Sequence, residues 1–192
     1  MVLTLGPPLT LPAQVAVHFS AGARYSGTLV HDSVVTPLDV RPALAPAVAV
    51  SVALAPHRGW SGEAMLDVSW STLRRHDAGG ASTSLGGLGA VAFAVGLRRQ
   101  LAAGVGTRVT VGGLKYLPAQ ESGVFRGGAS EVFALLGVGV DYRLPFGRGL
   151  TVDARVDAHR FLTRAMRDAG FTEHRLVPRA SLTVGVDLTS LW

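Results

Sequence analysis

The feature that most constrains this chain is a two-residue alternation of polar and apolar side chains. It is clearest from Thr151 to His159, where polar or charged residues alternate with Val and Ala. A helix would spread these charges around its axis, whereas successive side chains of a β-strand point to opposite faces. The segment therefore predicts a strand with one charged face and one apolar face.

Seven further segments alternate in the same way. They are Val15–Tyr25, Ala47–Leu54, Trp60–Ser71, Gly89–Arg98, the segment around Val105, Glu131–Arg143 and Arg179–Leu188. Tight turns at 56–59, 99–102 and 145–148 alternate with longer connections at 26–44, 74–84, 117–128 and 163–175. Eight strands joined by alternating short and long connections predict an all-β, antiparallel, up-and-down β-barrel.

The composition favours a lipid environment for such a barrel. Of 192 residues, 48% are hydrophobic and 16% are charged, against about 25% charged in ordinary soluble domains. The mean hydropathy is +0.34. No run of about 18 apolar residues is present to form a membrane-spanning helix. With no cysteine, the chain has neither disulfides nor thiolate metal sites.

The two strand faces differ in a way that predicts which one is internal. The polar faces combine Gly, Ala, Ser and Thr with acidic and basic residues in nearly equal number, whereas the opposite faces are Val, Leu, Ala and aromatic residues. Balanced charges among small residues suit a narrow interior that side chains fill, as in an eight-stranded barrel. The predicted lumen charge network comprises Arg24, Glu63, Asp67, Arg108, Asp141, Asp153, Arg155, Asp157, Arg179 and Asp187.

Aromatic residues gather near both ends of the predicted strands. Trp60, Tyr142, Phe146 and Trp192 lie at the short-turn end, and Tyr25, Trp70, Tyr116 and Phe161 lie at the long-loop end. Two aromatic belts at the membrane interfaces are typical of transmembrane barrels.

From Val15 to Trp192 the chain resembles the small eight-stranded bacterial outer-membrane barrels, the OmpA-transmembrane-like and OmpX-like proteins. The resemblance rests on this architecture and on the C-terminal segment VGVDLTSLW, which ends in an aromatic residue. Trp192 replaces the usual Phe, and Ser190 stands where a hydrophobic residue is expected. The resemblance implies a transmembrane β-barrel in the bacterial outer membrane that the barrel-assembly machinery inserts. It does not define a subfamily.

The domain organisation is simple. Residues 1–13 are apolar, uncharged and proline-rich, and they predict a signal-peptide remnant cleaved after Ala13, although a positively charged start is missing. Residues 14–192 then form one outer-membrane barrel domain.

Two groups of polar residues raise the question of chemistry. His18 and Ser20 share a strand face, and some lipid A deacylases carry a His/Ser pair on a barrel. Asp153, Asp157 and His159 could form an acid–base cluster or a metal site. An interior face closed to lipid argues against the first reading. Arg155 between the two carboxylates favours a ladder of ion pairs over the second. We predict neither catalytic residues, nor a metal, nor a cofactor.

Glycines opposite long charged residues suit a tightly packed interior. If the turn at 145–148 sets a simple register, Gly137 and Gly139 face Asp157 and Arg155, and Gly185 faces Asp153.

Basic residues outnumber acidic ones in the long loops. Arg164, Arg167 and Arg175 are the predicted contacts to lipopolysaccharide phosphates, which guanidinium groups bind in a bidentate manner. Nucleic acid is not a predicted partner, because basic residues do not interleave with aromatic ones and no recognition helix is present.

The sequence therefore predicts an outer-membrane barrel with a side-chain-filled polar lumen and a structural or surface-interaction role through its extracellular loops. Its predicted partners are outer-membrane lipid and lipopolysaccharide, the assembly machinery, and an unidentified extracellular or membrane protein. A narrow small-solute channel, a lipid A-modifying enzyme and a soluble ligand-binding barrel are the alternatives.

Overall fold

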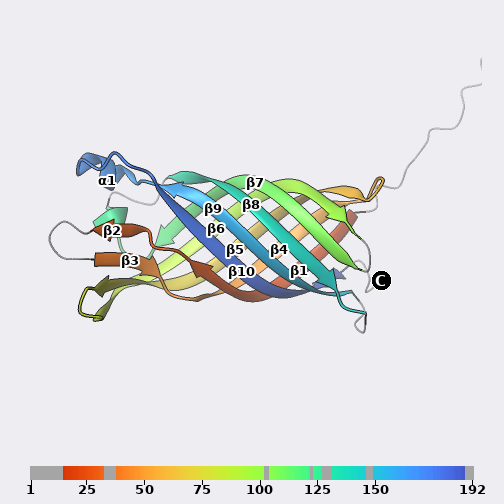
Figure 1. Cartoon of the computed structure of the whole chain (residues 1–192), viewed down its shortest axis with the longest axis horizontal. Coiled ribbons are helices and arrows are strands. Elements are labelled where there is room, and N and C mark those ends of the chain that lie inside the picture. The colour runs from red at the N-terminus through yellow and green to blue at the C-terminus, as the bar shows by residue number, and fades with distance from the viewer. Residues whose placement is uncertain are drawn as a thin grey trace, which may run out of the picture.

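Eight antiparallel strands close into a barrel in the computed structural model (Figure 1). The structure describes residues 15–32, 38–101, 104–121, 123–126, 131–145 and 149–188. The barrel strands are β1 (Val15–Ser26), β4 (Ala45–Leu54), β5 (Trp60–Asp77), β6 (Ser82–Gln100), β7 (Val105–Pro118), β8 (Val132–Arg143), β9 (Leu150–Phe161) and β10 (Arg175–Asp187).

The ring closes because the first strand pairs with the last. β1 pairs with β4 on one side and with β10 on the other, and every other neighbour in the ring is a sequential hairpin. Closure leaves no unpaired strand edge around the wall, as a chain surrounded by lipid requires. The prediction of an eight-stranded antiparallel up-and-down barrel is confirmed. The predicted signal-peptide remnant, 1–13, lies outside the described residues.

Two predicted loops contain strand. The short strands β2 (Val30–Asp32) and β3 (Leu38–Pro42) form a hairpin within 26–44, and β3 pairs with the outer part of β5. The β5–β6 hairpin runs on to a turn at 78–81, through most of 74–84, with a register shift between Thr72 and Arg74. A small sheet therefore projects beyond the long-loop end of the barrel (Figure 1).

Two helical turns cover the same end. The 3₁₀ turn η1 (Gly123–Phe125) and the short helix α1 (Arg164–Asp168) belong to the other two long loops. The Thr163 hydroxyl donates to the Val124 carbonyl over 2.6 Å and accepts from the Met166 amide at the start of α1. One side chain thus caps the helix and ties the two loops together. No helix in the described ranges is long and apolar enough to span a membrane.

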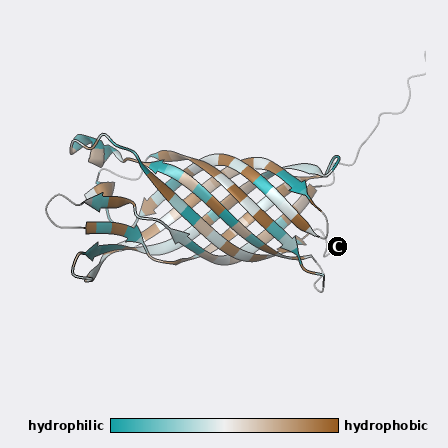
Figure 2. Cartoon of the chain, viewed as in Figure 1, coloured by the Kyte–Doolittle hydropathy of each residue, from teal (hydrophilic) through white to brown (hydrophobic). Residues whose placement is uncertain are grey.

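The large apolar side chains of the barrel face outward, the reverse of their distribution in a soluble protein. Phe93, Val95 and Leu97 of β6 are exposed on the outer wall, whereas Ala90, Ala92 and Ala94, on the opposite face of the strand, are buried. Figure 2 shows this alternation as a chequered pattern along the tilted strands. A soluble barrel would place its large apolar side chains inside, so this outer wall is suited to lipid.

The interior changes character along its axis. Polar and charged side chains fill the part nearer the short turns, whereas the long-loop end holds an apolar core. That core includes Leu29, Leu114, Phe161, Leu162 and Val177. The expected lumen, polar throughout, is therefore wrong for this end. The reason is that the inward faces of β6 to β10 become apolar toward this end, and the loops and the small projecting sheet add further apolar side chains.

The strand register tests the glycine pairs. Gly137 lies opposite Asp157 and Gly139 opposite Arg155, as expected. Gly185 lies opposite Thr151, and Asp153 faces Thr183 instead. The β9–β10 register is set by the long connection at 163–175, whose length no tight turn fixes, so that expectation was wrong by two residues.

Candidate functional site

Five charged side chains form a layer nearer the short turns, the turn-side layer: Glu63, Arg98, Arg108, Asp141 and Asp153. Arg108 is its centre. Its nitrogens lie 3.5 Å from a Glu63 oxygen, 3.0 Å from Asp141 and 2.5 Å from Asp153. Arg98 donates two hydrogen bonds to the Asp141 carboxylate, of 2.9 and 2.5 Å.

A second group, the loop-side layer, lies deeper and comprises Arg24, Asp67, Arg155, Asp157 and Arg179. Both terminal nitrogens of Arg24 donate hydrogen bonds to the Asp67 carboxylate. Arg155 bridges Asp67 at 3.3 Å and Asp157 at 3.2 Å, and it donates to the Met65 sulfur. Arg179 lies 3.7 Å from Asp67 and 3.5 Å from Asp157.

The two layers carry opposite charge surpluses. The turn-side layer has three carboxylates and two guanidinium groups, and the loop-side layer has two carboxylates and three guanidinium groups. Their charges cancel only when the two layers are taken together. Burial makes such cancellation necessary, because an unpaired charge away from water is costly.

The structure brings nine of the ten predicted lumen residues into these layers. Asp187 lies apart, at the short-turn rim, where Arg143 contacts it at 3.2 Å. Arg98 joins the turn-side layer although the predicted network omitted it. Its position on the polar face of β6, two residues after Gly96, could have identified it as a lumen residue from the sequence.

Aromatic rings close the interior above the loop-side layer. We call this the aromatic cap; it comprises Tyr116, Phe125, Phe133, His159 and Phe161. Their ring centroids lie 5.2–6.3 Å apart. The Tyr116 hydroxyl lies 3.1 Å from His159 Nε2. Phe125 enters this cap from the loop, as part of η1.

The cap corrects two assignments to the outer aromatic belts. Tyr116 is 2% exposed and Phe161 is 0% exposed, so both lie inside the barrel. Each shares its strand face with charged interior residues, Arg108 for Tyr116 and Asp157 for Phe161. Counting in steps of two along the strand, rather than nearness to a strand end, would have placed them correctly.

The remaining belt residues that the structure describes are exposed on the wall. They are Trp60 and Tyr142 at the short-turn end and Tyr25 and Trp70 at the long-loop end. The Arg99 guanidinium lies 5.2 Å from the centroid of the Trp60 ring, in a cation–π contact. Phe146 and Trp192 lie outside the described residues.

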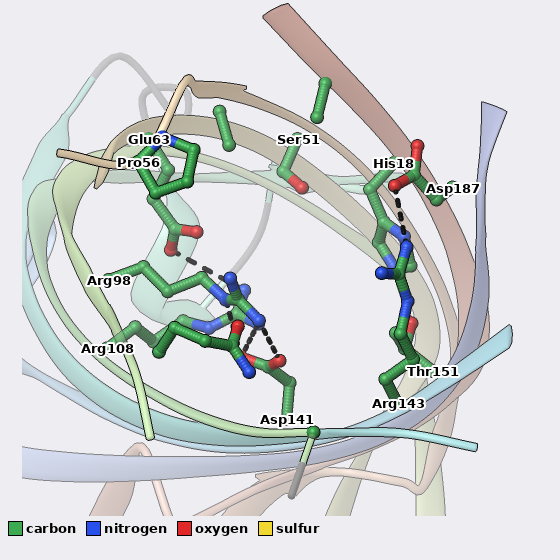
Figure 3. A pocket seen from close by; sticks show the side chains of 14 residues that line it. His18, Ser51, Pro56, Glu63, Arg98, Arg108, Asp141, Arg143, Thr151 and Asp187 are labelled. Atoms are coloured by element: carbon green, nitrogen blue, oxygen red, sulfur yellow. Dashed lines mark hydrogen bonds and ion pairs between the residues drawn. The ribbon is translucent and has the colours of Figure 1, made fainter. Parts of the chain in front are cut away.

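A cavity of about 420 Å³ opens at the short-turn end, and we call it the vestibule. Glu63, Arg98, Arg108 and Asp141 converge on its floor, and Arg143 and Asp187 lie at its side (Figure 3). Beyond the floor, a second pocket of about 10 Å³ lies between the two layers. That is about the space of one water molecule.

The residues considered for chemistry contact other interior side chains. His18 Nε2 lies 3.0 Å from the Thr151 hydroxyl, and buried Ser20 faces the interior rather than lipid. Asp153 contacts Arg108, Asp157 contacts Arg155 and Arg179, and His159 contacts Tyr116. Among the described residues, no group of three or more His, Asp or Glu is placed to hold a metal ion.

The three predicted lipopolysaccharide contacts have different surroundings. Arg167 donates to Glu131 and to the Leu162 carbonyl, so it holds the loop together. Arg164 is exposed and lies 3.8 Å from Asp168. Arg175 is exposed at the first position of β10.

Four other cations form what we call the outer girdle: Arg41, Arg74, Lys115 and Arg160. All are exposed near the long-loop end. Arg41, Lys115 and Arg160 each lie between two buried neighbours on their strands, and Arg74 follows buried Leu73. Arg41 and Arg74 lie directly opposite each other on β3 and β5. Within the described part of the chain, none of the four forms an ion pair or a hydrogen bond through its side chain. Lys115 and Arg160 lie on the barrel strands β7 and β9, and Arg41 and Arg74 lie on the small sheet beyond them.

The sequence matches no protein-family model, and no curated protein sequence is significantly similar to it. Solved structures similar to it include Yersinia pestis Ail in a phospholipid nanodisc (13% identity, TM-score 0.48, 91% of this chain and 100% of that one). Neisserial surface protein A has 12% identity, TM-score 0.48, and coverage of 91% and 97%. OprG of Pseudomonas aeruginosa has 9% identity, TM-score 0.46, and coverage of 91% and 94%.

At these identities the likeness concerns the fold alone. The chain's own closed ring, its outward apolar wall and its internal ion pairs are the features of a membrane-spanning barrel. The protein is a small, closed, eight-stranded antiparallel β-barrel whose outer wall is suited to lipid.

Proposed function

We propose that this protein is a sealed surface barrel that binds lipopolysaccharide phosphates through its outer girdle and meets other partners through its loops. The observation that carries the proposal is the pair Arg41 and Arg74. Like charges directly opposite each other on neighbouring strands destabilise a sheet. A phosphate between the two guanidinium groups would remove that repulsion through charge-assisted hydrogen bonds.

The position of the girdle supports the same partner. Trp70 and Tyr25 on the wall at this end suit the membrane interface, and Arg74 follows Trp70 on the outward face of β5. The short-turn end differs, because its outward Arg99 stacks on Trp60. An anionic outer leaflet would therefore meet the long-loop end of the barrel.

The test is lipopolysaccharide retention by the purified barrel at low and high salt. We expect the double variant Arg41→Gln/Arg74→Gln to retain less lipopolysaccharide than the wild type. The difference should shrink as salt rises, because exposed charges are screened beyond about 8–10 Å at physiological ionic strength. Arg99→Gln is the matched control at the opposite end. Equal retention by the double variant and the wild type would refute the girdle as the binding site.

A second arm tests the loop arginines. Neutralising Arg164, Arg167 and Arg175 together measures the contribution of the loop, and Arg167→Gln alone controls for the lost contact to Glu131. A loss confined to the loop variants would place the phosphates on the loop instead of the wall.

A narrow channel is the second candidate, and the vestibule is the observation that favours it. Against it stand the two ion-pair layers and the aromatic cap, which fill the path beyond the vestibule. We expect little steady conductance in planar bilayers. Large, stable, ion-selective openings would favour the channel.

We propose that the protein is not an enzyme. His18 and Ser20 face the interior, so neither reaches the acyl chains of lipid A from where it lies. Mass spectra of lipid A from cells with and without the protein would test this, and a changed acylation pattern would refute it. Insertion by the barrel-assembly machinery, inferred from the C-terminal segment, stays a prediction.

A further inference from the structure

We propose that the vestibule is a binding site for a compact organic cation carrying a primary amine, taken up from the short-turn side of the membrane. The proposal is independent of lipopolysaccharide binding, because the two sites lie at opposite ends of the barrel. It rests on the shape of the vestibule, on the charge of its floor and on one buried carboxylate oxygen.

The size of the vestibule fits a small organic molecule. Ligand pockets typically enclose about 300–1,000 Å³, and this cavity has about 420 Å³. The residues that shape it come from strands all around the ring, including His18 of β1, Ser51 of β4 and Thr151 of β9. Side chains from several strands thus surround the site (Figure 3).

The turn-side layer as a whole carries a surplus of negative charge, with three carboxylates against two guanidinium groups, although its third carboxylate, Asp153, does not itself line the vestibule. Arg108 is shared among three carboxylates, and Arg98 serves Asp141 alone. Of the three carboxylates, Glu63 has the weakest ion pairing. It is 7% exposed, its Oε1 atom has no hydrogen-bond donor among the described groups, and its ion pair with Arg108 is long, at 3.5 Å.

An ammonium group can supply the hydrogen-bond donor that the Glu63 carboxylate lacks. It carries a positive charge and three N–H donors in a small volume. Bound above the floor, it would supply the missing hydrogen bond to Glu63 and balance the three carboxylates of the turn-side layer.

The loop-side layer explains why such a ligand would stop there. Behind the floor the pocket narrows to about 10 Å³, and the next layer has one guanidinium group in excess. A cation moving inward would meet both a steric block and electrostatic repulsion. The vestibule is therefore suited to holding a cation and not to passing it.

The experiment compares three ligands with the same four-carbon chain: putrescine, 1,4-butanediol and succinate. The full barrel, labelled with ¹⁵N in zwitterionic detergent micelles, is titrated with each. We expect saturable shifts of the Gly104 and Thr151 amide signals with putrescine alone. The Glu63→Gln variant should weaken putrescine binding about tenfold, because a charge-assisted hydrogen bond is lost.

Two further variants keep the test decisive. Glu63→Gln leaves two carboxylates and two guanidinium groups in the layer, so the barrel should fold, as heat-modified gel mobility will show. Ala53→Phe fills the vestibule without changing its charge and should abolish binding, whereas Arg99→Gln on the outer wall should not alter it. Equal shifts with all three ligands, or unchanged putrescine affinity in Glu63→Gln, would overturn the proposal.

Discussion

Arg108, which is half-buried, and Arg155, which is buried, are both arginines of the lumen, but their neighbours differ. Arg108 alone contacts Glu63 and Asp153, whereas Arg155 shares its two carboxylates with Arg24 and Arg179. Removing Arg108 leaves three carboxylates and one guanidinium group in its layer. Removing Arg155 leaves its layer balanced, with two of each.

We therefore expect unequal effects from matched substitutions. Arg108→Met should lower the free energy of unfolding by about 3–5 kcal/mol, the usual cost of a stranded buried charge. Arg155→Met should cost less, about 1–2 kcal/mol, through its lost hydrogen bonds. Urea unfolding of both variants in the same micelles provides the measurement. Equal losses would mean that charge balance within a layer does not govern stability.

Which residues face inward could be read from the sequence, but their partners could not. A period of two assigns Arg24 and Asp67 to the interior without any structure. Their pairing joins β1 to β5 across the barrel, over 43 positions, and no local rule specifies such a contact. The charge surplus of each layer depends on these long-range contacts, so it could not be predicted from the sequence either.

At the scale of elements, η1 holds the aromatic cap in place. Phe125 of η1 is 3% exposed, and its ring centroid lies 5.9 Å from that of Tyr116 and 6.0 Å from that of Phe161. Phe125→Ser should release η1 and α1 while the barrel strands stay paired, because the ion-pair layers do not depend on this ring. Hydrogen exchange should accelerate in both helical turns and remain slow in β7 and β9.

Phe171→Ser is the matched control, since Phe171 is exposed in the loop that follows α1. The control should leave exchange unchanged. If Phe125→Ser also left it unchanged, the cap would not depend on η1. Neither helical turn was predictable, because each is shorter than the window in which helical periodicity can be recognised.

At the scale of the whole molecule, orientation in lipid is the property to test. Val184 is exposed on the outer wall, and Gly185 beside it faces the interior next to His18. Val184→Arg should cost about 2–4 kcal/mol if the residue lies at the bilayer midplane. Spin labels at 184 and 185 should report lipid and lumen, respectively. The reverse pattern would contradict the membrane-spanning interpretation of the barrel.

The whole ring was predictable, because eight alternating segments with alternating connection lengths allow few other topologies. The outer extension was not. Beyond Trp70 the residues Arg74, Arg75 and His76 are all polar, so the two-residue period disappears although β5 continues to Asp77. Pairing with β3 and β6, and not an amphipathic pattern, maintains the strand there.

The two ion-pair layers differ in which strands supply them. The turn-side layer takes one residue from each of β5, β6, β7, β8 and β9, which are consecutive along the chain. The loop-side layer needs Arg24 of β1 and Arg179 of β10, the first and last strands. The first layer can thus assemble in a curved, still open sheet, whereas the second is completed only when the chain ends meet. The loop-side layer would then form last during barrel closure, and the contact between Arg179 of β10 and Asp67 of β5, which crosses the seam between β1 and β10, would be present only in the closed ring.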